Sequence, residues 1–191
     1  PQGNTTSGLG VDKNDLENTV YELILGECSV QECILRNVIE GVSVIPSNVN
    51  LAAAEIELIG VDKKEYILKR EIDWVKDLYD YVLIDCPAGI EQGYRNAVAG
   101  ADRAIVVTTP EISAVRDADR IIGLLEQEAI EPPKLIINRI RKHLMDSGDT
   151  LDITEVTAHL SIDLLGIIID SEDVISSSNK GEPIVMDPNN K

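Results

Sequence analysis

Tyr81-Val82-Leu83-Ile84-Asp85-Cys86-Pro87-Ala88-Gly89 is the stretch of sequence that indicates the fold most directly. Four apolar or aromatic residues precede one carboxylate, and Pro and Gly follow it, which is typical of a buried parallel strand that ends at Asp85. Ligands of open α/β sheets bind at that edge, where a carboxylate commonly orients the water shell of a Mg²⁺ ion. The alternative is an Asp that caps the next helix, and this segment alone leaves both open.

The segments on either side of this stretch alternate between helical and strand patterns. Helices are expected over 16–24, 51–59, 68–79, 91–101, 113–125 and 152–160, and strands over 42–45, 104–108, 135–138 and 164–169, with a weaker strand at 184–186. Ser113 is expected to cap one helix, and the pair Asp152 and Glu155 another. This alternation predicts a single α/β domain over residues 1–191 with a mostly parallel, doubly wound sheet.

Composition narrows the class of protein. The 191 residues contain no Phe and 3% aromatic residues, so the core must be built from Ile, Leu and Val, which suits parallel strands covered on both faces. The formal net charge of −17 disfavours broad attraction to nucleic acid or anionic lipid. No apolar run has the length of a membrane span and no signal peptide is apparent, so a cytoplasmic location is expected.

The three cysteines do not form a disulfide framework. Cys28 and Cys33 have four residues between them, and Cys86 lies in the predicted strand. Reduced, packed thiols are therefore expected. His143 and His159 have no partners at the spacing of metal ligands.

Several motifs resemble the ParA/MinD family of deviant-Walker ATPases. Over residues 75–191 the chain resembles the MinD branch, which places the bacterial division site, and over residues 1–72 it resembles the ParA (Soj) branch, which partitions chromosomes. The first resemblance rests on 83–91, on Pro110-Glu111-Ile112-Ser113-Ala114-Val115-Arg116-Asp117-Ala118-Asp119-Arg120, on Asn138-Arg139 and on Ser178-Asn179-Lys180-Gly181-Glu182-Pro183. The second rests on residues 1–10, on Ile45-Pro46-Ser47-Asn48 and on 51–58.

The resemblance implies a P-loop NTPase-like fold of the SIMIBI type that binds ATP and Mg²⁺. Asp85 would order the Mg²⁺ shell, and Pro87 and Gly89 would belong to a second switch that senses the γ-phosphate. Asn138 would face the adenine, with Arg139 beside it. The alternatives are an ordinary turn for Pro87 and Gly89, and for Asn138 a turn residue that bonds its own backbone.

The resemblance also implies partners. Four residues of one predicted helix would form a dimer or partner surface, against the alternative of a solvated helix face: Glu111, Ser113, Arg116 and Asp117. An ATP-dependent homodimer is expected, together with a division regulator or a partition-complex protein. Membrane binding is not expected of this chain, because no basic amphipathic segment is present, although an intact parent could lie at the inner membrane face.

One family feature is missing from the sequence. No glycine-rich phosphate loop with a Lys-Ser or Lys-Thr ending occurs, and Gly8-Leu9-Gly10 is too short to be one. No catalytic residue is therefore assigned. We expect this incomplete domain, which lacks the strand of the phosphate loop, to hydrolyse ATP poorly and to be marginally stable.

Three functions follow in order. The first is part of an ATP-driven dimerisation switch for division-site selection. The second is a partitioning ATPase with salt-sensitive DNA binding. The third is a non-catalytic fragment that keeps only partner surfaces. The basic cluster Arg139, Arg141, Lys142 and His143 has no interleaved aromatic residues, which favours a solvated loop over a nucleic-acid site.

Overall fold

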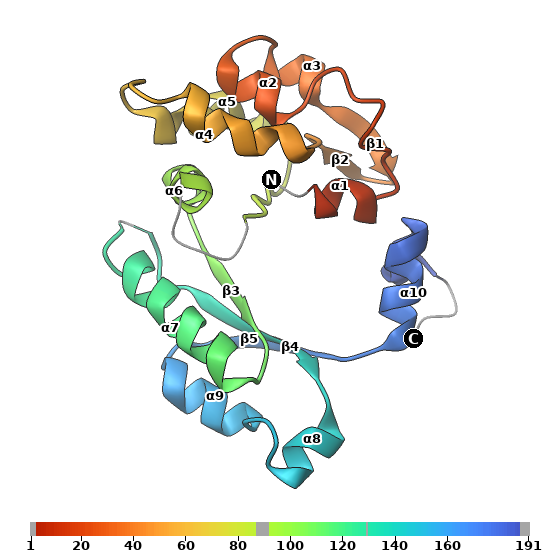
Figure 1. Ribbon diagram of the computed structural model, residues 1–191, viewed down its shortest axis with the longest axis vertical. Helices are drawn as coiled ribbons and strands as arrows, with labels where there is room; N and C mark the ends of the chain where they lie inside the picture. Colours follow the sequence, from red (N-terminus) through yellow and green to blue (C-terminus); the bar gives the residue numbers. More distant parts are fainter. Residues whose placement is uncertain (1–2, 87–91, 129, 188–191) are drawn as a thin grey trace. The chain divides into compact units, whose positions relative to one another are not determined.

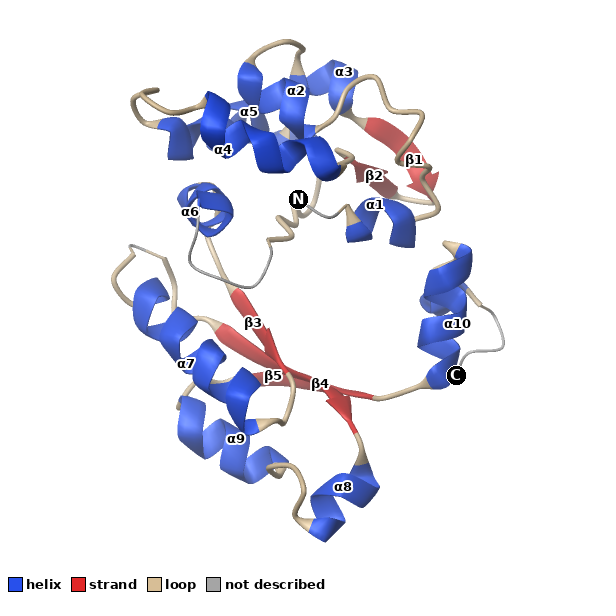
Figure 2. Cartoon of the chain, viewed as in Figure 1, coloured by secondary structure: helices blue, strands red, loops and turns tan. Residues whose placement is uncertain are grey.

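A computed structural model of the chain describes residues 3–86, 92–128 and 130–187. The chain divides into two compact units, one made of residues 1–100 with 173–191 and the other of residues 101–172 (Figure 1). Each unit has its own strands and helices (Figure 2). They are described separately below, beginning with the one that contains the parallel sheet.

The parallel sheet of the second unit has three strands in the order β3-β4-β5. They span β3 (Ile105–Thr108), β4 (Lys134–Ile140) and β5 (Leu164–Ile169), and both pairings are parallel. Helices follow the strands as α7 (Ile112–Leu125), α8 (Lys142–Ser147) and α9 (Ile153–Leu160). The α/β class and the parallel sheet predicted from the sequence are therefore confirmed.

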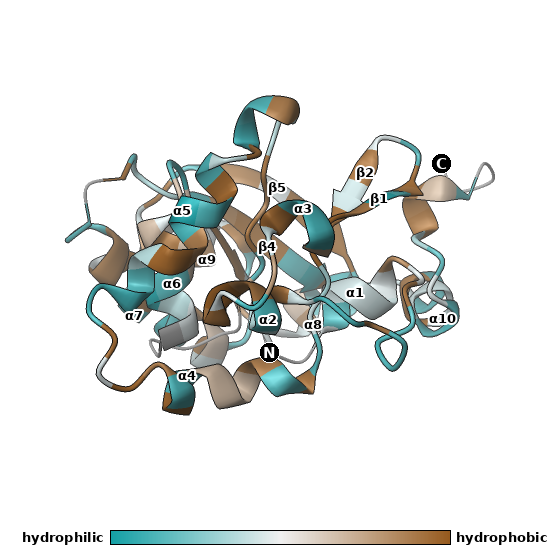
Figure 3. Ribbon diagram, turned by 90° about the horizontal axis from the view of Figure 1, so that it is seen from above, coloured by the Kyte–Doolittle hydropathy of each residue, from teal (hydrophilic) through white to brown (hydrophobic). Residues whose placement is uncertain are grey.

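One face of this sheet carries the core of the unit. Val106 and Thr108 are 7% and 5% exposed, whereas Ile105 and Val107, which alternate with them, are 51% and 58% exposed. Helix α7 packs against β3 and α9 through the buried face that its periodicity predicts, namely Val115, Ala118, Ile122 and Leu125. The ribbon of β5 is coloured as hydrophobic in Figure 3, yet most of its side chains are exposed. The second unit thus leaves apolar sheet surface open.

The helix caps of this unit agree with the sequence at one helix and differ at the other. Asp152 accepts from the Glu155 N–H, and Glu155 accepts from the Asp152 N–H, both at 2.8 Å, so the predicted capping box is confirmed. The cap predicted at Ser113 is wrong. The carbonyl of Glu111 already accepts from the Val115 N–H at 3.0 Å, so Glu111 is the N-cap and Ser113 lies inside the first turn.

The first unit consists of short helices around a hairpin. The hairpin pairs β1 (Leu35–Ile39) with β2 (Val42–Val44) in antiparallel fashion. The helices are α1 (Asn4–Gly8), α2 (Val20–Leu25), α3 (Val30–Cys33), α4 (Ala54–Glu57), α5 (Ile67–Asp73), α6 (Gln92–Ala99) and α10 (Glu172–Lys180). Two small clusters form its core, one around Leu23 and Cys33 and the other around Ile24 and Leu58. Strand β1 was not anticipated, because Arg36 and Asn37 interrupt its apolar pattern.

Two strands predicted from apolar runs are wrong. Residues 81–86 have no strand pairing with any described residue, and Leu83 is 88% exposed. A strand exists only where a neighbour completes its backbone hydrogen bonds, and an apolar run alone does not supply that neighbour. Ile184–Met186 form a 3₁₀ turn instead of a strand. The helix expected over 51–59 is split into a 3₁₀ turn, Val49–Ala53, and α4.

The helices were also compared with the requirements of a membrane span. Within the described residues, none has both the length and the apolar character needed to cross a bilayer.

Candidate functional site

Asp85 is held beside the first helix of the chain. The hydroxyl of Thr5, in α1, donates a hydrogen bond to Asp85 Oδ2 across eighty positions of sequence. Asp85 is exposed, so its carboxylate remains accessible to a ligand. Carboxylate and hydroxyl oxygens are the donor types that Mg²⁺ prefers in proteins. This pair is the only part of the first unit where a residue predicted to bind the metal meets a second oxygen donor among the described residues.

The neighbour of Asp85 responds to the same charge. Loss of solvent around the sulfur raises the pKa of the Cys86 thiol, and the Asp85 carboxylate raises it further. A thiol with a raised pKa is a poor nucleophile near neutral pH. Cys86 is therefore not a candidate nucleophile, and the chemistry at this position rests on the carboxylate.

The two sequence motifs of the front part come together at Thr6. Its hydroxyl accepts a hydrogen bond from the Ser47 N–H at 2.9 Å, and its side chain is 2% exposed. Gly3, in the same segment, approaches the backbone of Ser47 so closely that an added Cβ would lie 2.2 Å from the Ser47 carbonyl oxygen. The segment that carries Thr5 is thus fixed against Ser47, which gives the Thr5 and Asp85 contact a structured support.

The predicted switch residues Pro87 and Gly89 lie outside the described residues. Their roles remain predictions. The contact of Thr5 with Asp85 was not foreseen, although Thr5 belongs to the segment whose resemblance was recognised. The only sequence signal for it was that both segments carry family motifs.

Asn138 and Arg139 form an irregularity at the carboxyl end of β4. Arg139 has a φ of +55°, and the pairing of β4 with β5 shifts register between Ile137 and Ile140. The Asn138 side-chain oxygen accepts from the Arg139 N–H at 2.9 Å. This is the local backbone bond that the sequence left open as an alternative. Bulges of this kind turn side chains out of the regular strand alternation and occur beside binding sites.

The ends of β3 and β4 meet as a parallel sheet requires. Thr108 pairs in register with Ile137, which directly precedes Asn138. The Thr108 hydroxyl is buried and bonds the Thr109 carbonyl at 3.3 Å. The sequence therefore located this part of the sheet edge correctly, within the second unit.

The predicted partner surface lies on the outer side of α7. All four of its residues are exposed, namely Glu111, Ser113, Arg116 and Asp117. Asp117 faces Arg120 at 3.9 Å, a solvated pair that contributes little to stability. Exposure fits a partner surface and a solvated face equally, so the predicted role stays a prediction.

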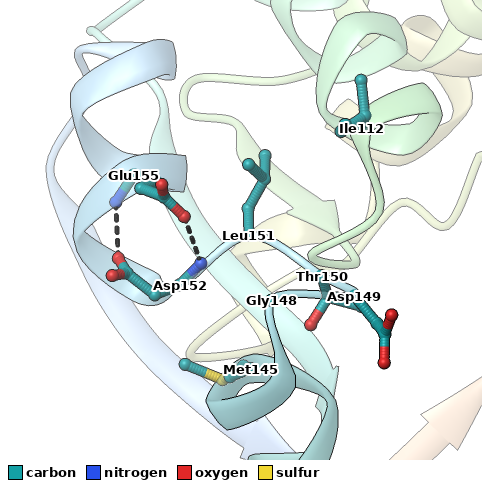
Figure 4. Close-up of a pocket in the computed structure, with 8 residues that line it drawn as sticks. All are labelled: Ile112, Met145, Gly148, Asp149, Thr150, Leu151, Asp152 and Glu155. Atoms are coloured by element: carbon teal, nitrogen blue, oxygen red, sulfur yellow. Dashed lines mark hydrogen bonds between the residues drawn. The ribbon is translucent and has the colours of Figure 1, made fainter.

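A pocket of about 310 Å³ lies beside the start of α7 (Figure 4). Ile112 and Leu151 supply apolar surface, and three carboxylates line it: Asp149, Asp152 and Glu155. Clustered carboxylates repel phosphate groups, so this pocket does not suit a nucleotide. The Leu151 N–H donates to the Pro110 carbonyl at 3.0 Å, which ties the pocket wall to the residue before α7.

The described residues contain no group of three or more His, Cys, Asp or Glu side chains that could hold a metal ion without further ligands. His143 and His159 accordingly gain no metal partner there. The Arg141 side chain pairs with Asp170 at 2.6 Å, and Lys142 and His143 begin α8. The basic cluster is thus partly neutralised within the second unit.

Comparison with known proteins gives consistent matches. A family model described as an AAA domain matches residues 1–134. The septum site-determining protein MinD of Bacillus subtilis is 70% identical over 125 residues, which cover 65% of this chain and 47% of that protein. A putative MinD of Guillardia theta is 40% identical over 185 residues, covering 95% of this chain and 65% of that protein. The chain thus spans about half to two thirds of the length of these relatives.

Solved structures give the same result. A MinC:MinD cell division protein complex of Aquifex aeolicus matches with a TM-score of 0.80 and 30% identity, covering 97% of this chain and 72% of the other. The septum site-determining protein MinD of Pyrococcus horikoshii, complexed with Mg-ADP, matches with a TM-score of 0.78 and 26% identity, covering 95% and 70%. Both the front and the rear of the chain therefore align with proteins of one kind.

Proposed function

The chain belongs to the family of AAA domains and, within it, to the ParA/MinD group of ATPases, and from that premise we propose that it serves in a MinD-type switch for division-site selection. The contact between Thr5 and Asp85 is the observation that carries the proposal. It joins the segment before the first helix to the carboxylate that the family motif assigns to Mg²⁺. Because the chain spans less than two thirds of these relatives, the activity of the whole protein is part of the proposal.

Asp85 and Thr5 are the residues that would hold Mg²⁺. Their oxygens are of the type that the ion prefers, and the exposure of Asp85 leaves room for bound water. The Pyrococcus horikoshii neighbour was solved with Mg-ADP, which supports the choice of ion and nucleotide. When bound, Mg²⁺ neutralises charge on the nucleotide phosphates.

Asn138 and Arg139 are proposed to contact the nucleobase. The bulge at Arg139 displaces both side chains from the strand alternation, and the Asn138 amide nitrogen is a donor that suits ring nitrogens. Pro87 and Gly89 are proposed as the second switch on the family motif alone. Since the sequence contains no phosphate-loop motif, this chain is expected to hydrolyse ATP poorly without that motif.

The exposed face of α7 is proposed as the contact for partners. Glu111, Ser113, Arg116 and Asp117 would meet a second copy or a division regulator. The Aquifex aeolicus neighbour was solved as a MinC:MinD complex, which supports a regulator of that kind. Partition of chromosomes is the second candidate, because residues 1–72 carry motifs of that branch. The net charge of −17 weighs against its DNA binding.

The test uses the full-length Bacillus subtilis relative, in which the matched 125 residues are replaced by those of this chain. Expected results are normal placement of the division site and Mg²⁺-dependent ATP hydrolysis by the purified protein. Asp85→Asn in the exchanged stretch is expected to lower hydrolysis at least about tenfold, because it removes charge that stabilises the transferred phosphate through Mg²⁺.

Asp77→Asn is the matched control, since it removes the same charge at an exposed position eight residues earlier. It is expected to leave hydrolysis unchanged. A folded exchange protein that misplaces the division site and binds DNA in a salt-sensitive way would favour partition instead. Loss of hydrolysis in both variants alike would refute the assignment of Asp85.

A further inference from the structure

The side chains of Cys28 and Cys33 lie in contact in the first unit. Their Sγ atoms are 3.0 Å apart, and both residues are free thiols. Cys33 is fully buried, whereas Cys28 is partly exposed. Because the sulfur atoms of a disulfide are about 2.05 Å apart, a shift of about one ångström would bring these two into bonding distance.

The capping of α3 explains why the two side chains meet. Ser29 is the N-cap, and its N–H and hydroxyl both donate to Glu32 Oε2, at 2.8 Å and 2.7 Å. Cys28 is the residue before this cap and Cys33 is the fourth residue of the helix. Residues at these two positions pack against each other across a capping box and usually form a hydrophobic staple. Here both staple residues are cysteines.

The surroundings keep Cys33 in place. It belongs to a core cluster with Leu23, Val30 and Val75, against which Cys28 packs from the outside. Its thiol also contacts the Thr19 carbonyl at 3.6 Å. The buried thiol therefore has little freedom to turn away from Cys28.

We propose that Cys28 and Cys33 form an oxidation-sensitive dithiol that small-molecule disulfides convert into an intramolecular disulfide. The Cys28 thiolate attacks one sulfur of the small disulfide and releases one small thiol. Cys33 then loses its proton to solvent and attacks Cys28 Sγ, which releases the second small thiol. Two protein thiols are oxidised and one small disulfide is reduced to two thiols, so electrons and atoms balance.

The order of the two steps follows from exposure. Burial raises the pKa of the Cys33 thiol above its usual range, and the hydrogen bond with Cys28 raises it further. Cys28 is the more accessible sulfur, so it is the one that meets the oxidant. Ring closure then links the residue before α3 to the last residue of that helix.

The test uses the full chain with Cys86→Ser, so that only the pair contributes thiols. The protein is incubated with oxidised glutathione under native conditions, and intact mass and alkylatable thiols are measured. The expected product has lost the mass of two hydrogen atoms, carries no glutathione and has no alkylatable thiol. A persistent glutathione adduct on Cys28, a disulfide-linked dimer, or two thiols that stay alkylatable would each overturn the proposal.

Two further measurements separate positioning by the fold from general thiol reactivity. Cys28→Ser in the same background leaves one buried thiol, which is expected to stay unmodified until the chain is unfolded. Ring closure in the Cys86→Ser protein is expected to slow about tenfold or more in urea, since the capping box no longer holds the sulfurs together. Equal rates in the native and unfolded chain would refute a role for the fold.

Discussion

Individual side chains and glycines connect distant parts of the first unit. Thr5 bonds Asp85, and Thr6 bonds Ser47. Gly10 and Gly181 approach each other across the unit, and an added Cβ on Gly10 would lie 2.8 Å from the Gly181 carbonyl oxygen. Gly10 also has a φ of +77°, which side chains rarely adopt. This contact ties the end of α1 to the residue after α10.

Gly10→Ala is accordingly expected to destabilise the protein by about 2 kcal/mol or more, because a left-handed backbone costs about 1–2 kcal/mol and the clash with Gly181 adds to it. Gly26→Ala is the matched control. Gly26 has the same φ of +77° but nothing within 4 Å of its would-be Cβ, so only the backbone cost applies. Urea unfolding measures both, and equal losses would contradict a close Gly10 and Gly181 contact in solution.

At the scale of elements, capping boxes start three of the helices. They pair Thr19 with Glu22, Ser29 with Glu32, and Asp152 with Glu155. Short helices are marginal without such partners for their first N–H groups. The three boxes therefore explain why α2 and α3, of six and four residues, persist.

The box of α3 makes stability depend on pH. Hydrogen bonds from the Ser29 hydroxyl and N–H lower the pKa of Glu32. A lowered pKa in the folded state means that the contribution is full above the unfolded pKa of about 4.3 and is lost as the pH falls through the folded value. Glu32→Gln is therefore expected to be less stable than the parent at pH 7 and to lose less stability between about pH 5 and pH 3.

Urea midpoints measured across that range check this expectation. Glu27→Gln removes the same charge from an exposed position outside the box and serves as the control. It is expected to follow the parent. Glu22 will still contribute a slope in every variant: burial raises its pKa, but hydrogen bonds from Thr19 outweigh burial and leave the pKa lowered. Parallel pH profiles for Glu32→Gln and the parent would contradict the box.

For the whole molecule, the dominant feature is apolar surface that its own unit does not cover. Val107 and Ile167 are 58% and 46% exposed on the β3-β4-β5 sheet, and Leu83 is 88% exposed in the first unit. Sheets with uncovered apolar surface and open edges tend to associate. This agrees with the expectation of marginal stability, which remains to be measured.

Val107→Thr with Ile167→Thr is expected to reduce self-association while leaving the urea midpoint nearly unchanged, because Thr keeps the strand preference and adds a solvated hydroxyl. Val106→Thr is the control on the covered face, where Val106 is 7% exposed. It is expected to cost about 1–3 kcal/mol, since it buries a hydroxyl. Sedimentation at several concentrations measures association, and an unaltered sedimentation profile for the double variant would show that this face does not mediate it.

The sequence anticipated the regular elements whose signals are local. The buried face of α7 and the cap at Asp152 follow from residues three or four positions apart, and β4 and β5 follow from compact Ile and Leu runs. It failed where the outcome depended on a distant neighbour. Residues 81–86 have the composition of a strand but find no strand partner among the described residues. The hairpin strand β1 has a poor apolar pattern but finds a partner in β2.

By itself, the sequence determined the α/β class, the family, and the identity of Asp85 and Asn138 as candidate residues, because motifs and periodicity are properties of neighbours along the chain. Only the tertiary structure decided that Thr5 meets Asp85, that Asn138 bonds the Arg139 backbone, and that two cysteines share a staple. These are hydrogen bonds and contacts whose geometry depends on how the backbone is folded. The opening stretch 81–89 identifies the family through its residues, whereas its conformation depends on which strands stand beside it.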